Sequence, residues 1–252
     1  MLQQERLDAI YMILSERNSA TVQYLQRQLY VSAATVRRDL EVMEKAGLIR
    51  RLWGGAMISS SAEKDIPDFV RNRTNSEAKA KIAVVASKLL RENSSIFIDS
   101  STSCYHLVPF LARHKQITVI TSSLRMQQLL AEHTNVNVHL LGGQVFDKGI
   151  ITGHMAIDSV RKYNADMMFF SCSGISAECG LSSIEAKVAE VSQEMMKHSA
   201  QKILLCDSSK VNKRGMWRLA EIDDMDYIIM DKAPEDQALL DAMGPRLMLN
   251  EN

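Results

Sequence analysis

The sequence predicts an α/β protein in two parts, a small helical domain that ends in a β-hairpin and a larger domain on a mostly parallel sheet. Three helical patterns and one glycine-containing hairpin pattern fill the first 58 of the 252 residues. Beyond residue 75, apolar strand patterns alternate with helical patterns, which is typical of a parallel sheet covered by helices. A chain of this length can hold two such domains. We therefore expect domains at residues 1–58 and 76–252, joined by a polar linker at 59–75.

Composition excludes several classes of protein. Lys plus Arg and Asp plus Glu both number 30, so the overall charge identifies no partner. The four cysteines form no C-x-x-C pair and the histidines show no ligand spacing, so we expect no metal and no cofactor. The N-terminus turns polar at Gln3, and the apolar runs are far shorter than the roughly 20 residues that span a bilayer. These features predict a cytoplasmic protein with reduced thiols and no membrane contact, in which Cys172 and Cys206 are small buried residues of apolar strands.

The first domain contains three predicted helices, each marked by apolar residues at helical spacing. The marking residues are Leu7, Ile10, Tyr11 and Leu14, then Val22, Leu25 and Leu29, then Val36, Leu40 and Met43. Ser32 is placed to cap the third helix through its hydroxyl, and Gly47 is placed to end it. Arg37 and Arg38 face away from the apolar seam of this helix. A helix with this division of faces suits insertion into the DNA major groove.

A hairpin follows the third helix at residues 48–58, which completes the plan of a winged helix-turn-helix. Arginines on the helix can reach guanine edges or phosphates, and those on the hairpin can follow the neighbouring backbone or minor groove. The predicted DNA-binding residues are Ser32, Thr35, Arg37, Arg38, Arg50, Arg51, Gly54 and Gly55. The alternative is a three-helix domain that binds protein and exposes its arginines to solvent. The capped helix and the arginine-bearing hairpin together favour DNA.

One continuous segment carries a family resemblance. Its sequence is S-A-A-T-V-R-R-D-L-E-V-M-E-K-A-G-L-I-R-R-L-W-G-G-A, from Ser32 to Ala56. It resembles the signature of the DeoR-type family of bacterial sugar-operon regulators, in which a V-S-x-x-T-[IV]-R-R-D-L helix precedes L-x-R-x-H-G-G-A. Trp53 stands where the family usually has histidine. The resemblance implies a C-terminal sugar-phosphate sensor domain similar in fold to ribose-5-phosphate isomerase, and a homo-oligomer.

Strands and helices alternate through the second domain after a first helix that Ser76 is placed to cap. Strands are predicted at residues 95–99, 117–121, 136–141, 167–172, 203–207 and 227–231. Helices are predicted at residues 105–114, 124–133, 156–163, 185–199 and 234–242. In an open parallel sheet, ligands gather outside the carboxyl ends of the strands. The loops that follow the strands are therefore the expected site.

Four of these strand ends carry small hydroxylated or glycine-bearing loops. Hydroxyls and amides supply donors for phosphate oxygens, and Lys210 supplies a positive charge. Asp99 and Asp207 can accept hydrogen bonds from sugar hydroxyls. The effector-binding residues predicted from these loops are Asp99, Ser100, Ser101, Thr102, Ser103, Ser122, Ser123, Ser173, Gly174, Asp207 and Lys210.

The same loops resemble the family's sensor domain, which carries D-x-G-T-T, T-N-S, L-G-G, G-x-x-[GA]-[IV] and D-x-S-K elements. This resemblance adds Gly142, Gly143 and Gly153 to the predicted effector site. Ser101 and Ser122 replace a glycine and an asparagine of the family pattern, so the family's particular sugar cannot be carried over.

The combination predicts a DNA-binding transcriptional regulator, a repressor of a carbohydrate-utilisation operon, that a phosphorylated sugar controls. One winged module offers little interface, so we expect a homodimer or homotetramer on repeated half-sites of double-stranded DNA. The alternative is a sugar-phosphate isomerase-like enzyme with an appended DNA-binding domain. Asp99, Glu185, Asp207 and Lys210 offer acid–base chemistry, but the sequence directs none of them at a substrate carbon, so we assign no catalytic residue.

Overall fold

The computed structural model describes residues 3–45, 48–58, 72, 74–131, 136–146 and 149–250. Its contacts divide the chain into two compact units, Met1–Thr74 and Asn75–Asn252. Gly47, the predicted end of the third helix, and most of the predicted linker at 59–75 lie outside the described residues.

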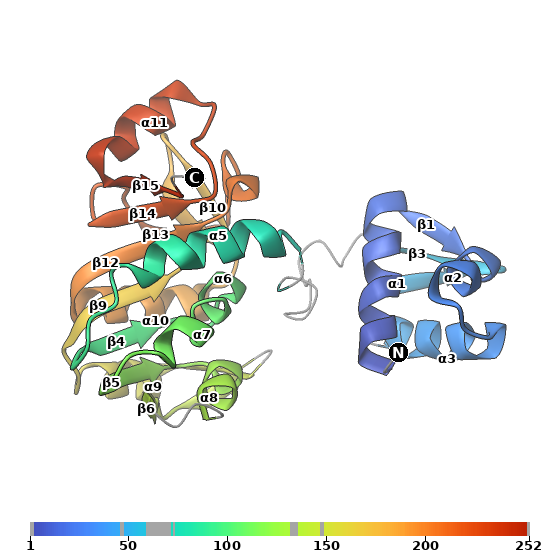
Figure 1. Cartoon of the computed structure of the whole chain (residues 1–252), viewed down its shortest axis with the longest axis horizontal. Helices are drawn as coiled ribbons and strands as arrows, with labels where there is room; N and C mark the ends of the chain where they lie inside the picture. Colours follow the sequence, from blue (N-terminus) through green and yellow to red (C-terminus); the bar gives the residue numbers. More distant parts are fainter. Residues whose placement is uncertain are drawn as a thin grey trace. The chain divides into compact units, whose positions relative to one another are not determined.

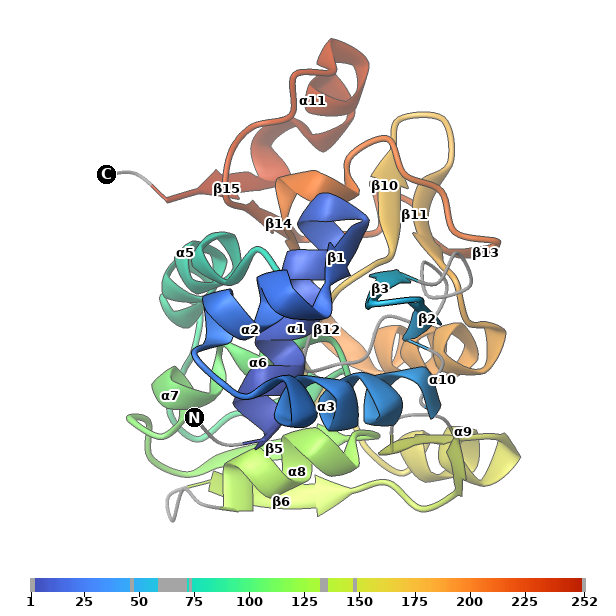
Figure 2. The same cartoon turned by 90° about the vertical axis from the view of Figure 1, so that its right-hand side faces the viewer.

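The first unit has the three helices and the hairpin that the sequence predicts (Figure 1 and Figure 2). Its elements are α1 (Gln3–Arg17), β1 (Ser19–Thr21), α2 (Val22–Leu29), α3 (Ala33–Lys45), β2 (Ile49–Leu52) and β3 (Gly55–Ile58). The marking residues of all three helices are buried in one cluster or packed against it. Strand β1 was not predicted: it pairs antiparallel with β3 and makes a three-stranded sheet in the order β1-β3-β2. Three residues between two helices are too few to show a strand's alternation.

The second unit is built on a seven-stranded parallel sheet in the order β15-β14-β12-β9-β4-β5-β6. The strands are β4 (Ser95–Ile98), β5 (Ile117–Thr121), β6 (Val136–Leu140), β9 (Ala165–Phe170), β12 (Ser199–Cys206), β14 (Tyr227–Met230) and β15 (Leu247–Leu249). The six strand predictions are confirmed, and β15 is the added strand. Because all seven strands run in one direction, their carboxyl ends meet at one edge of the sheet.

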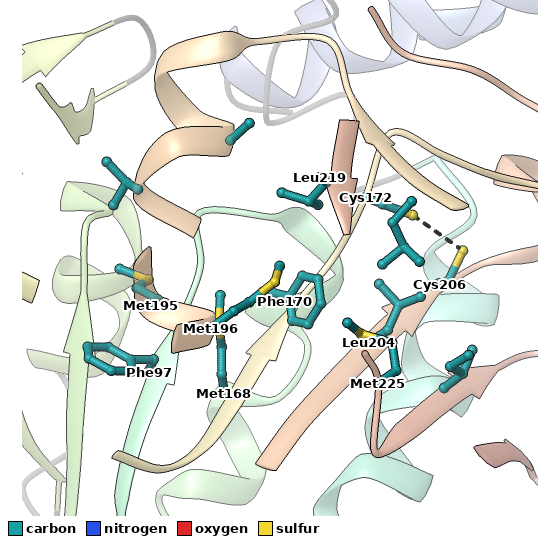
Figure 3. Packing of buried hydrophobic residues seen from close by; sticks show 14 of the residues in the cluster. Phe97, Met168, Phe170, Cys172, Met195, Met196, Leu204, Cys206, Leu219 and Met225 are labelled. Carbon is teal, nitrogen blue, oxygen red and sulfur yellow. Dashed lines mark hydrogen bonds between the residues drawn. The ribbon is translucent and has the colours of Figure 1, made fainter. Parts of the chain in front are cut away.

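Helices cover both faces of this sheet (Figure 1). They are α5 (Ser76–Ser87), α6 (Thr102–Tyr105), α7 (Val108–Leu111), α8 (Leu124–Ala131), α9 (His154–Val160), α10 (Ala186–Lys197) and α11 (Gln237–Met243). Alternate strand residues face opposite layers: Phe97 packs in the cluster with α9, α10 and α11, whereas Ile96 and Ile98 pack with α5 to α8. Figure 3 shows Phe97 in the first of these clusters, with Met195 and Met196 of α10.

The helix predicted at residues 105–114 is wrong as one element, because α6 and α7 are separate short helices. Pro109 lies in the first turn of α7. Proline has no amide hydrogen to donate and its fixed φ suits a helix start, so it begins a new helix here instead of continuing one.

Small antiparallel elements extend beyond the main sheet, and the sequence predicts none of them. They are the hairpin of β7 (Gln144–Phe146) and β8 (Ile150–Thr152), and a three-stranded sheet of β10 (Gly174–Ser176), β11 (Gly180–Ser183) and β13 (Trp217–Ala220). The hairpin follows β6 along the chain, and β10 follows β9. Strands this short occupy what the sequence suggests are loops.

The two glycines of the predicted hairpin tip differ in their surroundings. Gly54 has a φ of +80° and open space where a side chain would stand. Gly55 is buried in β3, and a Cβ there would collide with the Ala20 carbonyl oxygen of β1. Close approach of two strands therefore explains the second glycine without DNA.

We expect Gly55→Ala to lower the free energy of unfolding of the first unit by about 2 kcal/mol, because the added methyl overlaps backbone atoms. Gly54→Ala, the matched control, should cost about 1 kcal/mol through its positive φ alone. Native-state amide hydrogen exchange of the first unit measures both losses. An equal or smaller loss for the Gly55 variant would contradict the proposed close packing of β1 on β3.

Candidate nucleic-acid interface and ligand site

Helix α3 begins at the cap that the sequence predicts. The Ser32 hydroxyl oxygen accepts the Thr35 backbone amide at 3.2 Å, and the two hydroxyls lie 2.9 Å apart. This cap satisfies one of the unpaired amides at the helix start. Tyr30, in the left-handed conformation with a φ of 54°, ends α2 two residues earlier. The left-handed Tyr30 and the Ser32 cap therefore mark the two ends of the turn between α2 and α3.

A buried ion pair fixes which face of α3 points outward. The Asp39 carboxylate has no exposed surface and receives two hydrogen bonds from Arg6 of α1, Nε to Oδ2 at 2.8 Å and Nη2 to Oδ1 at 3.2 Å. These hydrogen bonds raise the pKa of Arg6. The pair therefore connects α3 to α1.

Arg37 and Arg38 lie beside this anchor and are exposed. Within the described ranges of the first unit, neither guanidinium makes an ion pair or a hydrogen bond to a protein group. A guanidinium without a protein partner keeps its full fork of donors for phosphate or for a guanine edge.

The hairpin of β2 and β3 carries the other two predicted arginines. Arg50 and Arg51 are exposed on β2. The Arg51 backbone amide donates to Glu44 Oε1 at 3.0 Å, and the Arg51 side-chain Nη1 lies 3.9 Å from Glu44 Oε2. These two contacts connect the last turn of α3 to β2. Trp53 at the turn is fully exposed.

In the second unit, Asp99 joins two loops at the carboxyl edge of the sheet. Its carboxylate is buried at the end of β4 and accepts the Ser101 amide on Oδ1 at 2.8 Å. Oδ2 accepts the amide of Ser171, in the loop after β9, at 2.9 Å. Two of the predicted loops are thus brought together by one carboxylate.

Lys210 extends this network to a third loop, the one after β12. Its ammonium donates to the Ser171 hydroxyl at 2.6 Å and lies 3.8 Å from Asp207 Oδ2. Burial of Asp207 pushes its pKa up, but the charge of Lys210 and hydrogen bonds from Ser209 and Asn75 outweigh burial, so the pKa lies below its ordinary value. Asp207 is therefore a carboxylate at neutral pH and holds the ammonium in place.

Asn75 is a member of this network that the sequence analysis missed. Its side-chain amide donates to Asp207 Oδ1 at 3.1 Å and to the Ser209 hydroxyl at 2.9 Å. It occupies the cap position of α5 with a φ of 57°, where the sequence predicts Ser76. Asparagine adopts this left-handed backbone conformation more readily than most residues. That preference is the only feature of the sequence that could have indicated Asn75 at this position. Asn75 is also the first residue of the second unit.

Further predicted hydroxyls are buried near the same edge. Residues 100–103 and 122–123 are all buried at the ends of β4 and β5. Ser123 caps α8 by accepting the Met126 amide at 3.1 Å. Among the described residues, the buried hydroxyl of Ser103 has no hydrogen-bond partner, and neither has that of Thr152 at the end of β8, which was not predicted. An unpaired buried hydroxyl is costly, and a polar ligand atom would satisfy it.

Three other predicted effector residues, Ser173, Gly174 and Gly143, contact the protein's own short strands and loops. The Ser173 hydroxyl accepts the Ile184 amide at 3.3 Å, and Gly174 packs against the Lys213 backbone, so both belong to the small sheet. Gly143 lies against Ile151 of β8. The two remaining glycines are not enclosed, since neither Gly142 nor Gly153 has a neighbour within 4 Å of the position of a Cβ.

Three further findings concern other kinds of site. A cleft of about 280 Å³ beside the small sheet is lined partly by Glu178, Cys179 and Arg214 and contains none of the predicted effector residues. Among the described residues, no group of His, Cys, Asp or Glu is arranged to hold a metal ion. No helix in the described ranges is long and apolar enough to cross a membrane.

Comparison with known proteins accounts for both units. The model of a DeoR-like helix-turn-helix domain matches residues 6–62, and that of a DeoR C terminal sensor domain matches residues 74–232. The chain belongs to the DeoR family. The sequence resemblance is confirmed, because this chain carries both a helix-turn-helix domain and a sensor domain of that family.

Full-length relatives include the HTH-type transcriptional repressor GlcR of Bacillus subtilis, 31% identical over 100% of this chain and 98% of the relative. The glycerol-3-phosphate regulon repressor of Haemophilus influenzae is 29% identical over 93% and 92%. The L-fucose operon activator of Escherichia coli is 30% identical over 94% and 98%. Among solved structures, a D-ribose-5-phosphate isomerase in complex with phospho-erythronic acid is 14% identical over 54% of each chain, with a TM-score of 0.41. That similarity is too low to carry over an activity.

We expect Asp39→Ala to lower the melting temperature of this DeoR-family protein's first unit, because the two hydrogen bonds from Arg6 to Asp39 are lost and with them a connection between α3 and α1. Glu41→Ala is the matched control, since that carboxylate is exposed on the same helix and pairs with the exposed Lys45. Calorimetry of the full-length variants measures the change. A control variant that melts as early as the Asp39 variant would show that the buried pair has no special role.

Proposed function

We propose that this chain is a sequence-specific repressor of a carbohydrate-utilisation operon, and that a phosphorylated sugar changes its affinity for the operator. One observation carries the proposal: an ammonium, two carboxylates and buried hydroxyls lie at the carboxyl edge of the sheet, in a chain whose first unit matches a DeoR-like helix-turn-helix domain.

The DNA half of the proposal places α3 in the major groove. Ser32 and Thr35 lie at its first turn, and the free guanidiniums of Arg37 and Arg38 reach base edges or phosphates. Arg50 and the hairpin turn lie against the neighbouring backbone. A single module of this size buries too little area for specific binding, so two or four copies act together on repeated half-sites.

The effector half places a phosphate at Lys210. This ammonium is held by Ser171 and Asp207, which leaves donor capacity for an anion. The orphan hydroxyls of Ser103 and Thr152 would gain partners from a polyol, and the remaining lone pairs of Asp99 suit a sugar hydroxyl. Phosphorylated sugars combine these two chemistries.

The geometry favours binding over turnover. Asp99 uses both carboxylate oxygens to hold backbone amides, and Asp207 is engaged by Asn75, Ser209 and Lys210. An isomerase needs a base free to take a proton from carbon. These contacts favour a sensor over the isomerase-like enzyme. A coupled isomerase assay on the wild-type protein would detect turnover of a sugar phosphate if the enzyme alternative were correct.

For the DNA half, we expect Arg38→Ala to weaken binding to the operator about 10- to 100-fold, the value of one good bidentate contact with guanine. The operator is first selected from a random duplex library by the wild-type protein. Arg113→Ala, which removes an exposed arginine from the second unit, is the control and should bind normally. Fluorescence anisotropy at fixed salt measures both. An Arg38 variant with wild-type affinity would exclude α3 as the reading helix.

For the effector half, we expect Lys210→Ala to bind the operator normally and to lose the response to phosphorylated sugars, because the phosphate loses its cation. A panel of sugar phosphates is screened by thermal shift, since a ligand bound only by the folded state raises the melting temperature. Lys213→Ala, exposed three residues later, should respond as the wild type does. A Lys210 variant that keeps the thermal shift would place the site elsewhere.

A further inference from the structure

Two cysteines lie together beside the proposed effector site. Cys206 ends β12, and Cys172 lies two residues beyond the end of β9. The two Sγ atoms are 3.9 Å apart in the interior of the second unit (Figure 3). The four cysteines of the chain are otherwise separate: Cys104 is buried in α6, and Cys179 is half-buried before β11.

The strand register aligns the pair for a covalent bond. Leu204 of β12 pairs with Phe170 of β9 in the parallel sheet, and continuing that register by two residues sets Cys206 opposite Cys172. Neighbouring strands lie about 4.8 Å apart, which is within the range of about 4.4–6.8 Å that disulfides bridge between Cα atoms. Rotation of the side chains can therefore close the gap between the sulfurs.

We propose that Cys172 and Cys206 are an oxidant-sensitive pair that forms a reversible disulfide in the folded protein when a peroxide is present. This modification site does not depend on which effector the protein binds. Disulfides in proteins of reducing compartments are mostly transient and redox-sensing, and a pair held in contact by the fold suits that use.

The surroundings give the two thiols different roles. A hydrogen bond from the Cys206 thiol and the nearby Lys210 ammonium lower the pKa of Cys172, although burial acts against them. The same hydrogen bond and burial raise the pKa of Cys206. Cys172 is 7% exposed and Cys206 is fully buried, so a small peroxide reaches Cys172 first. The thiolate is the nucleophilic form of cysteine.

The reaction balances with peroxide as the only oxidant. The Cys172 thiolate attacks one peroxide oxygen and expels hydroxide, which gives a sulfenic acid. The Cys206 sulfur then attacks the Cys172 sulfur and loses its proton, and the hydroxyl group leaves with that proton as water. Together two thiols lose their hydrogens, and one peroxide becomes two waters.

The bond would restrict the strand ends that carry the proposed effector network. Ser171 precedes Cys172 and Asp207 follows Cys206, and these two residues hold the Lys210 ammonium. Cys104 is a poorer nucleophile than Cys172, because burial and the neighbouring Asp99 carboxylate raise the pKa of its thiol. The pair, and not cysteine content in general, therefore confers the sensitivity.

The test treats the full-length protein with hydrogen peroxide, blocks remaining thiols under denaturing conditions and maps the peptides by mass spectrometry. We expect one cross-linked peptide joining Cys172 to Cys206, lighter by two hydrogens and reversed by dithiothreitol. Cys172→Ser and Cys206→Ser should abolish it. Cys179→Ser, the matched control, should keep it.

Circular dichroism before treatment establishes that each serine variant is folded. The proposal is overturned if the folded wild type keeps both thiols free after peroxide. It is equally overturned if the cross-link forms only after the protein is unfolded, or if Cys104 or Cys179 is the partner. Each result is read without an operator or an effector, so failure of the proposed function would leave it unaffected.

Discussion

Two buried carboxylates at the carboxyl edge of the sheet, Asp99 and Asp207, connect the loops that carry the core of the proposed effector site. Burying a charge is costly unless hydrogen bonds or an opposite charge compensate it. Asp99 is compensated by amides from the loops after β4 and β9, and Asp207 by Ser209, Asn75 and Lys210. The requirement to satisfy these groups draws the loops of three strands and the start of α5 into one network.

Periodicity made most of the architecture predictable. Strand and helix patterns are long enough in the second unit to define six strands, and the apolar stripes of α1, α2 and α3 are the observed core of the first. The misses have local causes. Strands β1 and β15 are three residues long, too short to show alternation, and Pro109 divides a helical pattern because of its backbone chemistry and not its polarity.

The candidate site was predictable as a set of loops but not as a set of side chains. Ser171 and Ser173 lie in one loop, yet the Ser171 hydroxyl meets Lys210 whereas the Ser173 hydroxyl accepts an amide of the small sheet. Which hydroxyl faces the proposed site depends on short strand pairings, here between β10 and β11. Strands of three or four residues are too short to produce a recognisable periodic pattern in the sequence. Asn75 was invisible for a related reason, since its partner Asp207 is 132 residues away along the chain.

Asn75 connects the proposed effector network to the first residues of the second unit. The Lys210 ammonium donates to the Ser171 hydroxyl and forms an ion pair with Asp207. A phosphate bound at Lys210 would compete with Asp207 for this ammonium. Asp207 would then depend more on its other donors, of which Asn75 stands where the chain enters the second unit. A ligand can shift an equilibrium only by the difference in its affinity for the two states. For the proposed effector, that difference would include the change in how Asp207 is shared between Lys210 and Asn75.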